Sequence, residues 1–251
     1  MEQQPHQSPF KVAMVPGIMP GKWVRTWAQR HPATPLELVP VDDADQLAPV
    51  RDASVQMAFV RDVDEHDGLH LIPLYAELTV VVLSHEHPWA EAPELALADL
   101  AEEHLMQDPA EVPGWAEVAD EVRDGTRLDL PEMTTRQRVE VVASGTGIVI
   151  LPMSVARLHQ RKDVVAVPVV DLAEHPVGLA WPRGAEAGDP RIEDFIGIVR
   201  GRTARISLGE SEAAQDARPE KSPRGPRPVP RTAKSRGGRG GTPRRGGRRR
   251  G

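Results

Sequence analysis

The sequence predicts an α/β protein in which strands and helices alternate and are arranged as two lobes. Short β-branched apolar runs alternate with helical periodicity along residues 10–60, and a similar rhythm returns between residues 104 and 169. Strands joined by helices of this length favour a parallel sheet that binds ligands at the carboxyl ends of its strands. Two further strand-like runs, 70–75 and 78–84, lie between the repeats, and a new unit is expected to begin there.

The elements of the first lobe follow from composition and flanking turn residues. Its strands are predicted at 10–15, 36–41 and 55–60. A helix is expected to begin at Pro20 and to carry an apolar face that contains Trp23 and Trp27, and a second helix is expected over 42–51. The order is therefore βαβαβ.

The second lobe is read in the same way. Its strands are predicted at 104–107, 128–133, 147–151 and 164–169, and its helices at 113–123, 134–144 and 154–160. A last strand at 177–181 and a last helix at 190–199 complete the chain of predicted elements. Two α/β lobes joined by two crossing strands fit this order.

The most informative stretch runs from Thr134 to Pro152. Thr134 followed by Gln137 is a capping box, and Gly145 supplies the left-handed turn that ends the helix. The run 147–151 is expected to be a buried, parallel strand. The N-terminus of the helix offers backbone N–H groups, a positive dipole end and the hydroxyls of Thr134 and Thr135, which together suit a small anion.

Charge divides the chain into two unlike regions. Residues 203–251 carry 14 Lys and Arg against 4 Asp and Glu, whereas residues 1–202 carry 17 basic and 33 acidic residues. The basic segment is rich in Arg, Gly and Pro and nearly empty of apolar side chains, so it is expected to be a disordered tail. Weak, nonspecific contact with nucleic acid through arginine is one expectation for it, and a solubilising extension without a partner is the other.

Other classes of protein find little support. The chain has no cysteine, which excludes disulfides and thiolate zinc sites within it. The start, MEQQPHQSPF, has no secretory signal pattern, and no apolar run is long enough to span a membrane, so a cytoplasmic protein is expected. No metal site is expected at His85-Glu86-His87, and no cofactor or catalytic group is predicted anywhere.

Four motifs resemble the effector-binding, or substrate-binding, domain of LysR-type transcriptional regulators. They share the family's strand, turn and lobe-crossing patterns and read FKVAMVPGIMP, RHP followed by LELVPV, DGLHLIPLYAELTVVVLSHEHPWA, and VASGTGIVILPMSVA. The resemblance covers residues 10–201. It implies a two-lobed periplasmic-binding-protein-like fold of type 2, a small-molecule effector between the lobes, pairing into a homodimer, and no reaction of its own.

Carried onto this chain, the resemblance implies domain bounds and site residues. Lobe I is expected at 10–78 and 178–202 after a short arm at 1–9, lobe II at 79–177, and the tail at 203–251. The implied effector-binding residues lie after strands and at a helix start: Gly17, Ile18, Arg61, Gln107, Asp108, Thr134 and Thr135. The effector is expected to be a small carboxylate or similar anion.

The chain departs from the family pattern at its start. Only about nine residues precede the first predicted strand, so the winged helix-turn-helix that usually comes first is expected to be lacking. The alternatives to an effector-sensing domain are a stand-alone solute-binding protein, an enzyme on the same fold, and a nucleic-acid-binding protein that acts through its Arg-Gly tail.

Overall fold

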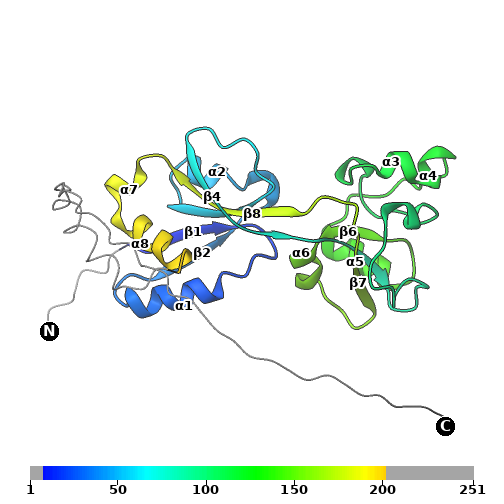
Figure 1. Cartoon of the computed structure of the whole chain (residues 1–251), viewed down its shortest axis with the longest axis horizontal. Helices are drawn as coiled ribbons and strands as arrows, with labels where there is room; N and C mark the ends of the chain where they lie inside the picture. The colour runs from blue at the N-terminus through cyan, green and yellow to red at the C-terminus, as the bar shows by residue number, and fades with distance from the viewer. Residues whose placement is uncertain (1–7, 202–251) are drawn as a thin grey trace, which may run out of the picture. The chain divides into compact units, whose positions relative to one another are not determined.

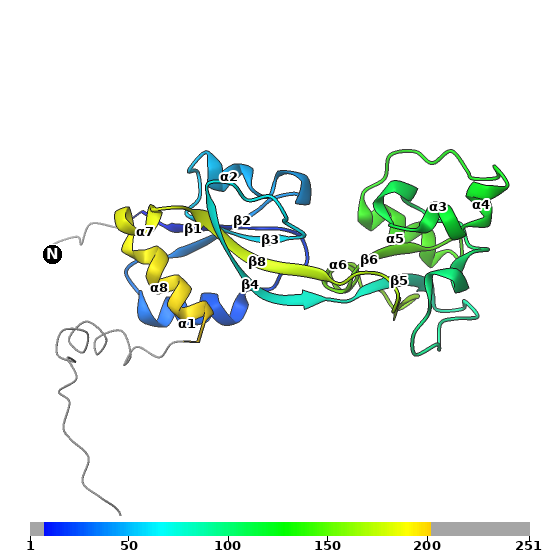
Figure 2. The same ribbon diagram turned by 45° about the horizontal axis from the view of Figure 1, so that its top comes forward.

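The structure is a computed structural model that describes residues 8–201. Residues 1–7 and 202–251 lie outside the described part, so the expected tail and most of the expected arm are not addressed. The described chain forms two sheets, each with its own helices (Figures 1 and 2). We call the first sheet with its helices lobe I and the second lobe II.

Lobe I is built on a mixed five-stranded sheet. Its strands are β1 (Phe10–Met14), β2 (Leu36–Pro40), β3 (Met57–Arg61), β4 (Leu69–Glu77) and β8 (His175–Pro182). Their order is β2-β1-β3-β8-β4, with β1 parallel to β2 and β3, and β8 antiparallel to β3 and β4. The expectation of parallel strands therefore holds for the first three, while the return of the chain through β8 makes the rest of the sheet antiparallel.

Alternating side chains divide the core of lobe I between the two faces of its sheet. The helices are α1 (Gly21–Arg30), α2 (Ala48–Arg51), α7 (Ala185–Gly188) and α8 (Pro190–Val199), with the 3-10 turn η1 (Asp43–Asp45) before α2. On one face Phe10 stacks on Trp27 of α1 and meets Phe195 of α8. On the other face Ala13 and Ala58 pack with Val50 of α2. The period-two pattern thus places aromatic residues under two long helices and alanines under a short one.

Lobe II contains a three-stranded antiparallel sheet. Its strands are β5 (Thr79–Ser84), β6 (Val149–Pro152) and β7 (Val164–Pro168), with β5 in the middle. Its helices and 3-10 turns are η2 (Leu97–Leu100), η3 (Pro109–Glu111), α3 (Trp115–Val118), α4 (Asp120–Arg123), α5 (Thr135–Ala143) and α6 (Met153–Leu158). Val81 and Leu83 pack against Trp115 on one face, and Val80 and Val82 pack against α5 and α6 on the other.

Two chain segments cross between the lobes. β4 runs almost directly into β5 through Leu78, and β7 leads back to β8. The sequence predicted two such crossings, and it also predicted the capping box of α5. The Thr134 hydroxyl accepts a hydrogen bond from the backbone N–H of Gln137, whose side chain accepts from the N–H of Thr134. Gly145 has the left-handed backbone that ends this helix.

Several predicted elements are corrected by the structure. The strand expected to be parallel at 147–151 is β6, which pairs antiparallel with β5, although Ile148 just before it makes one parallel bridge to Leu105. The expected strand at 104–107 is reduced to that bridge. The expected strand at 128–133 does not form, and Leu128 is exposed. Pro131 lies within this run, and a proline removes a hydrogen-bond donor from a strand.

Two expected helices are interrupted. The range 42–51 contains η1 and the short α2, because Pro49 is tolerated only in the opening turn of a helix. The range 113–123 contains α3 and α4, separated where Ala119 takes an extended backbone conformation and is buried.

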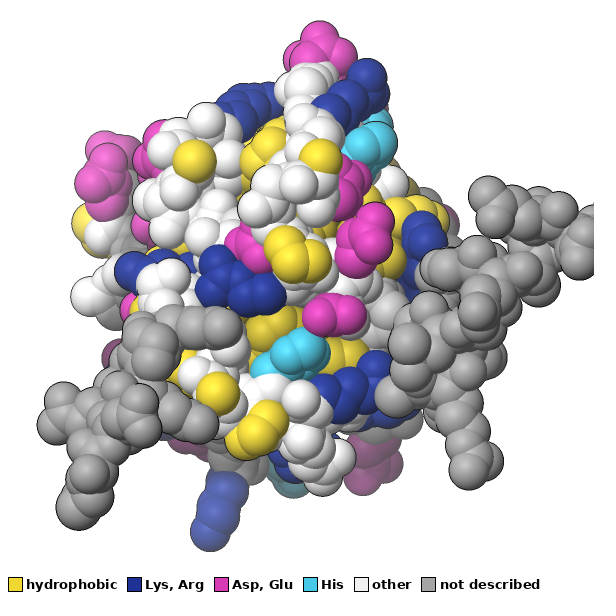
Figure 3. Space-filling model, turned by 90° about the vertical axis from the view of Figure 1, so that its left-hand side faces the viewer, with side chains coloured by type: hydrophobic (Ala, Val, Ile, Leu, Met, Phe, Trp, Pro, Cys, Tyr) yellow, Lys and Arg dark blue, Asp and Glu magenta, His cyan; other side chains and the backbone are white. Residues whose placement is uncertain are grey.

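The tryptophans of α1 belong to the core of their own chain. Trp27 is fully buried and donates its indole N–H to the carbonyl of Thr34, and Trp23 stacks on Phe59 with ring centroids 5.1 Å apart. On the face of the molecule in Figure 3, hydrophobic atoms are visible only in small separate groups among acidic and basic side chains. Trp27, on the apolar face expected for this helix, therefore packs within its own chain.

No helix within residues 8–201 is long and apolar enough to cross a membrane.

Candidate ligand-binding site

A large cavity lies where the two lobes and a crossing strand meet. It has a volume of about 1140 Å³. Its walls come from the turn after β1 (14–19), the end of β2 (40–42), the end of β4 (75–78) and α6 (153–158). The carboxyl ends of β1 and β2 therefore open onto it, as expected for parallel strands of an α/β sheet.

The turn after β1 touches lobe II directly. Gly17 has a left-handed φ of +85°, and a Cβ atom placed on it would lie 2.6 Å from Oγ of Ser154 and 2.7 Å from the carbonyl carbon of that residue. The backbone of α6 cannot give way like a flexible side chain. Glycine at this position is thus required both by backbone conformation and by the approach of the lobes.

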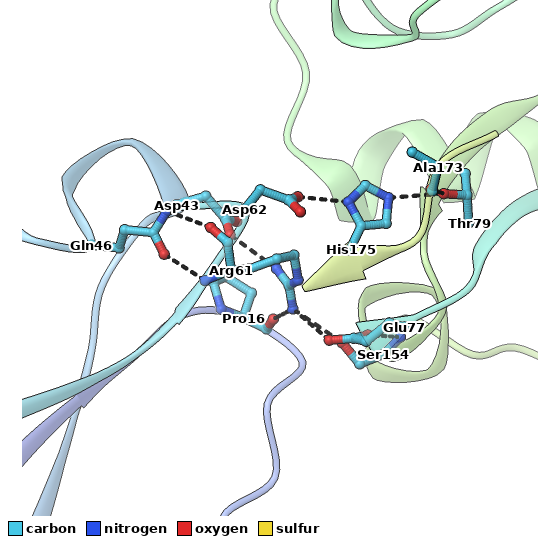
Figure 4. Close-up of polar contacts among 10 residues, drawn as sticks. All are labelled: Pro16, Asp43, Gln46, Arg61, Asp62, Glu77, Thr79, Ser154, Ala173 and His175. Atoms are coloured by element: carbon cyan, nitrogen blue, oxygen red, sulfur yellow. Dashed lines mark hydrogen bonds and ion pairs between the residues drawn. The ribbon is translucent and has the colours of Figure 1, made fainter. Parts of the chain in front are cut away.

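Arg61 joins the lobes through its guanidinium group (Figure 4). The side chain is almost fully buried; Nη1 donates to Asp43 at 2.9 Å and Nη2 to the carbonyl of Pro16 at 2.8 Å. Nη2 also lies 3.1 Å from Oγ of Ser154 in lobe II. Gln46 fixes the backbone of Arg61 through two 2.8 Å hydrogen bonds, so the guanidinium is held in place from both ends.

Glu77 is the buried anionic partner of this network. Its Oε2 accepts a 2.9 Å hydrogen bond from the backbone N–H of Ser154, and its Oε1 lies 3.5 Å from Nη2 of Arg61. Within residues 8–201, neither Oε1 of Glu77 nor Nε of Arg61 has a hydrogen-bond partner. Burial raises the pKa of Asp43, on the other side of Arg61, although the guanidinium acts in the opposite direction.

A second polar bridge links the crossing segments. The imidazole of His175, at the start of β8, has Nδ1 2.6 Å from Asp62 Oδ2 and Nε2 3.0 Å from the Thr79 hydroxyl (Figure 4). Thr79, at the start of β5, donates to the carbonyl of Ala173 at 2.6 Å. The two crossing strands and the end of β3 are thereby connected side by side.

The residues predicted as effector-binding separate into three groups. Gly17 and Ile18 line the cavity. Arg61 is not among the residues that line it but contacts the lining residues Pro16, Glu77 and Ser154. The other four lie in lobe II and are not part of the cavity lining: Gln107, Asp108, Thr134 and Thr135.

Local structural contacts engage the side chains of three of those four residues, Gln107, Asp108 and Thr134. The buried Gln107 accepts from the backbone N–H of Ile150 at 2.8 Å and donates to Glu111. Asp108 caps the short η3 turn by accepting from Ala110 N–H. Thr134 is the N-cap of α5, and Thr135 is the first residue of that helix.

Sequence reasoning missed the part of the site that α6 supplies. Ser154 is the point at which lobe II meets Gly17 and Arg61, and Arg157 lines the cavity one turn further along the helix. The available signal was the step from β6 into α6 at Pro152, which places a helix start at a strand end. Sequence alone did not show which of two such helix starts, α5 or α6, faces the other lobe.

The described residues contain no group of three or more His, Cys, Asp and Glu side chains placed to hold a metal ion. In the His85-Glu86-His87 segment, Nε2 of His87 instead contacts Glu103 at 3.0 Å.

Comparison with known proteins identifies the family. A model of the LysR substrate binding domain matches residues 3–204. The uncharacterized HTH-type transcriptional regulator YnfL of Escherichia coli K12 is 26% identical over 174 residues, which are 66% of this chain and 57% of that protein. The chain therefore spans a little over half the length of this curated relative.

Solved structures agree on the fold. The BenM effector binding domain with its effector benzoate has a TM-score of 0.60 at 18% identity, over 82% of this chain and 94% of that one. The reduced form of OxyR has a TM-score of 0.58 at 20% identity, over 78% of this chain and 95% of that one. Together with the family match over most of the chain, the two lobes and the cavity between them place this protein in the LysR substrate-binding domain family.

Proposed function

We propose that the chain senses a small organic molecule, with an anionic group, that binds in the cavity between lobes I and II. The observation that carries this proposal is that one cavity takes walls from both lobes and from a crossing strand. A molecule bound there contacts both lobes at once, so its binding energy depends on their arrangement, and such differential affinity is what lets a ligand shift a conformational equilibrium. No chemical reaction is part of the proposal.

Relatives support the sensing role without naming the ligand. The BenM domain is recorded with benzoate, an organic carboxylate, as its effector, and that assignment belongs to BenM. OxyR is recorded in reduced and oxidised forms. The present chain contains no cysteine, so thiol–disulfide chemistry within these 251 residues is not available to it.

Ligand screening with a blocked-cavity control tests the proposal. The full chain is screened against a panel of organic acids by thermal shift, and hits are measured by titration calorimetry. Leu158→Trp places a bulky group on an exposed residue of the cavity wall, and Leu128→Trp makes the same change at a comparably exposed residue that does not line it. We expect Leu158→Trp to weaken binding at least tenfold and Leu128→Trp to leave it within twofold. Equal binding by both variants would place the ligand elsewhere.

Two finer partner assignments also remain proposals. Pairing into a homodimer is expected from the family resemblance, and sedimentation of the full chain at tens of micromolar tests it. Nonspecific nucleic-acid contact through residues 203–251 is expected from composition alone, since that segment lies outside the described residues. Deleting it should abolish retention on nucleic acid at low salt.

A further inference from the structure

We propose that the ligand is amphipathic, with an apolar body much larger than a benzoate ring and an anionic group that Arg157 binds. This inference rests on the proposed function and narrows the ligand class of the same cavity. It also assigns the recognition of the anion to a residue that the sequence motifs did not indicate.

The apolar character of the cavity supports the large apolar body. Seven large hydrophobic residues are exposed within residues 8–201, and four of them line this one cavity: Met19, Tyr75, Leu78 and Leu158. Scattered single hydrophobic residues need no explanation, but a contiguous exposed group marks a binding surface. Met19 lies on lobe I and Leu158 on lobe II, so apolar surface is offered from both sides.

The size of the cavity also favours a ligand with a large apolar body. Its volume of about 1140 Å³ lies above the range of about 300–1,000 Å³ that is usual for sites of drug-sized ligands. Three methionines, Met14, Met19 and Met153, contribute to its walls from both lobes. Their unbranched thioether side chains adapt to irregular apolar shapes, which suits a bulky or flexible body better than a single small ring.

The charges in the cavity wall identify Arg157 as the contact for the anion. The guanidinium of Arg61 already contacts Asp43, Pro16, Ser154 and Glu77, and Arg61 does not line the cavity. Arg157 lines the cavity and is exposed, and its side chain has no ion pair or hydrogen bond with another residue in the range 8–201. A guanidinium with free donors matches the planar geometry of a carboxylate.

The two carboxylates of the wall do not reverse this assignment. Glu77 is buried against the Arg61 guanidinium and the N–H of Ser154, which compensate its charge. Asp42 is exposed on the opposite lobe, where solvent and salt screen it. Burial raises the pKa of Tyr75, and Glu77 adds to the rise, so the phenol beside them is neutral at pH 7.

The test uses probes of matched length and different charge. Decanoate, decanol, decyltrimethylammonium and butyrate are titrated into the full chain, below their micelle concentrations, by calorimetry. We expect decanoate to bind at least tenfold more tightly than butyrate and than decyltrimethylammonium. Comparable affinity for butyrate would contradict the proposal that the ligand has a large apolar body. Tighter binding of the cationic probe would contradict the proposal that it carries an anionic group.

Variants assign the charge contact. Arg157→Gln should weaken the binding of decanoate about tenfold, equivalent to about 1.4 kcal/mol. It should change the affinity for decanol less than twofold. Arg161→Gln is the matched control, because it removes the same charge four residues later from a side chain paired with Asp163 and outside the cavity wall. Its decanoate affinity should stay within twofold.

The outcomes separate this inference from the proposed function. If Arg157→Gln binds decanoate as the parent does, the role of Arg157 is wrong while a ligand in the cavity still stands. If none of the four probes binds but a small acid from the panel does, with Leu158→Trp blocking it, the inference fails and the sensing function survives. Urea unfolding of each variant shows that a lost affinity is not a lost fold.

Discussion

Two arginine–glutamate pairs occupy different regions of the molecule and differ in how completely they are bonded. In lobe II, Oε1 of Glu121 lies 2.6 Å from Nη1 of Arg127, and this carboxylate also accepts from Trp115 and Leu105. Where the lobes meet, Oε1 of Glu77 lies 3.5 Å from Arg61. That oxygen and Nε of Arg61 are the two side-chain atoms of the described chain that are buried without a hydrogen-bond partner.

The difference teaches where the fold is fixed and where it can change. A fully bonded buried network specifies one arrangement, and the Glu121 network ties α3, α4 and the Leu105 segment together inside lobe II. Buried atoms without partners cost free energy, so the junction is bonded less completely than the Glu121 network. We therefore expect variants of the Glu121 network to change stability alone, and variants at the junction to change stability and ligand binding together.

The largest effect is expected for Arg61→Ala at the junction. Removing the guanidinium leaves Glu77 as an uncompensated buried charge, which costs about 3–5 kcal/mol of unfolding free energy. Chemical denaturation of the full chain measures the loss. The double variant Arg61→Ala with Glu77→Gln removes that charge as well and should recover about 0.5–3 kcal/mol, the usual coupling energy of contacting residues. A double variant no more stable than Arg61→Ala would show that the pair is not coupled.

Gly17→Ala is expected to lower the free energy of unfolding by about 3 kcal/mol. Comparing this variant with a glycine variant in lobe II tests the junction at a single backbone position. The left-handed conformation accounts for about 1–2 kcal/mol, and the overlap of the new methyl group with α6 accounts for about 1–3 kcal/mol more. Gly145→Ala is the matched control, because Gly145 has φ of +84° and no neighbouring atom within 4 Å of the added Cβ. Gly145→Ala should therefore lose only the stability that the left-handed conformation costs, about 1–2 kcal/mol.

Ligand affinity completes the comparison of the two glycines. Gly17→Ala forces the turn after β1 away from Ser154 and should lower the affinity for the acid that the screen identifies. Gly145→Ala should leave that affinity unchanged. Calorimetry on both variants measures this. If the two glycine variants lose the same stability and the same affinity, the contact between Gly17 and α6 is not a constraint on the lobes.

Glu121→Gln is expected to cost about 2 kcal/mol at pH 7 without a change in ligand affinity, because the carboxylate is the shared acceptor of charged and neutral donors. Burial acts to raise the pKa of Glu121, but hydrogen bonds from His104, Trp115 and Leu105, together with Arg127, lower it below its ordinary value. A group with a lowered folded pKa stabilises the fold above its unfolded pKa.

That stabilisation is lost as the pH falls through the folded pKa. The difference in unfolding free energy between the parent and Glu121→Gln should therefore be full at pH 7 and shrink below about pH 4.3, the ordinary glutamate value. Denaturation at pH 7, 5 and 3.5 gives the curve. A difference that stays constant down to pH 3.5 would mean that the charge of Glu121 contributes nothing.

Local signals in the sequence predicted local structure well. Thr134 and Gln137 are three residues apart, and the bonds of a capping box need only those residues, so the start of α5 was predicted correctly. The crossing segment was predicted because DGLHLIPLYAELTVVVLSHEHPWA resembles the lobe-crossing segment of the family.

Pairing and orientation depend on residues distant in sequence and were predicted less well. The composition of 147–151 indicates a strand but not its partner, and β6 lies antiparallel to β5, from which it is about 70 residues away. The sequence did not indicate the contacts of Arg61, whose partners Pro16, Glu77 and Ser154 come from three other parts of the chain. Nothing local to Arg61 indicates that these three converge on it.

The smallest effect is expected for variants of the two threonines at the start of α5. These variants distinguish an anion site at this helix, as predicted from the sequence, from a site in the cavity between the lobes. Thr134→Ala removes the N-cap and should cost about 1 kcal/mol, whereas Thr135→Ala spares the hydrogen bond to Gln137 and should cost less. Because neither residue lines the cavity, we expect both variants to bind the screened acid within twofold of the parent. Calorimetry and urea unfolding on the pair give both quantities. If Thr135→Ala instead loses affinity on the order of tenfold with little change in stability, the anion binds at the start of α5, and the assignment of Arg157 must be given up in favour of that helix N-terminus.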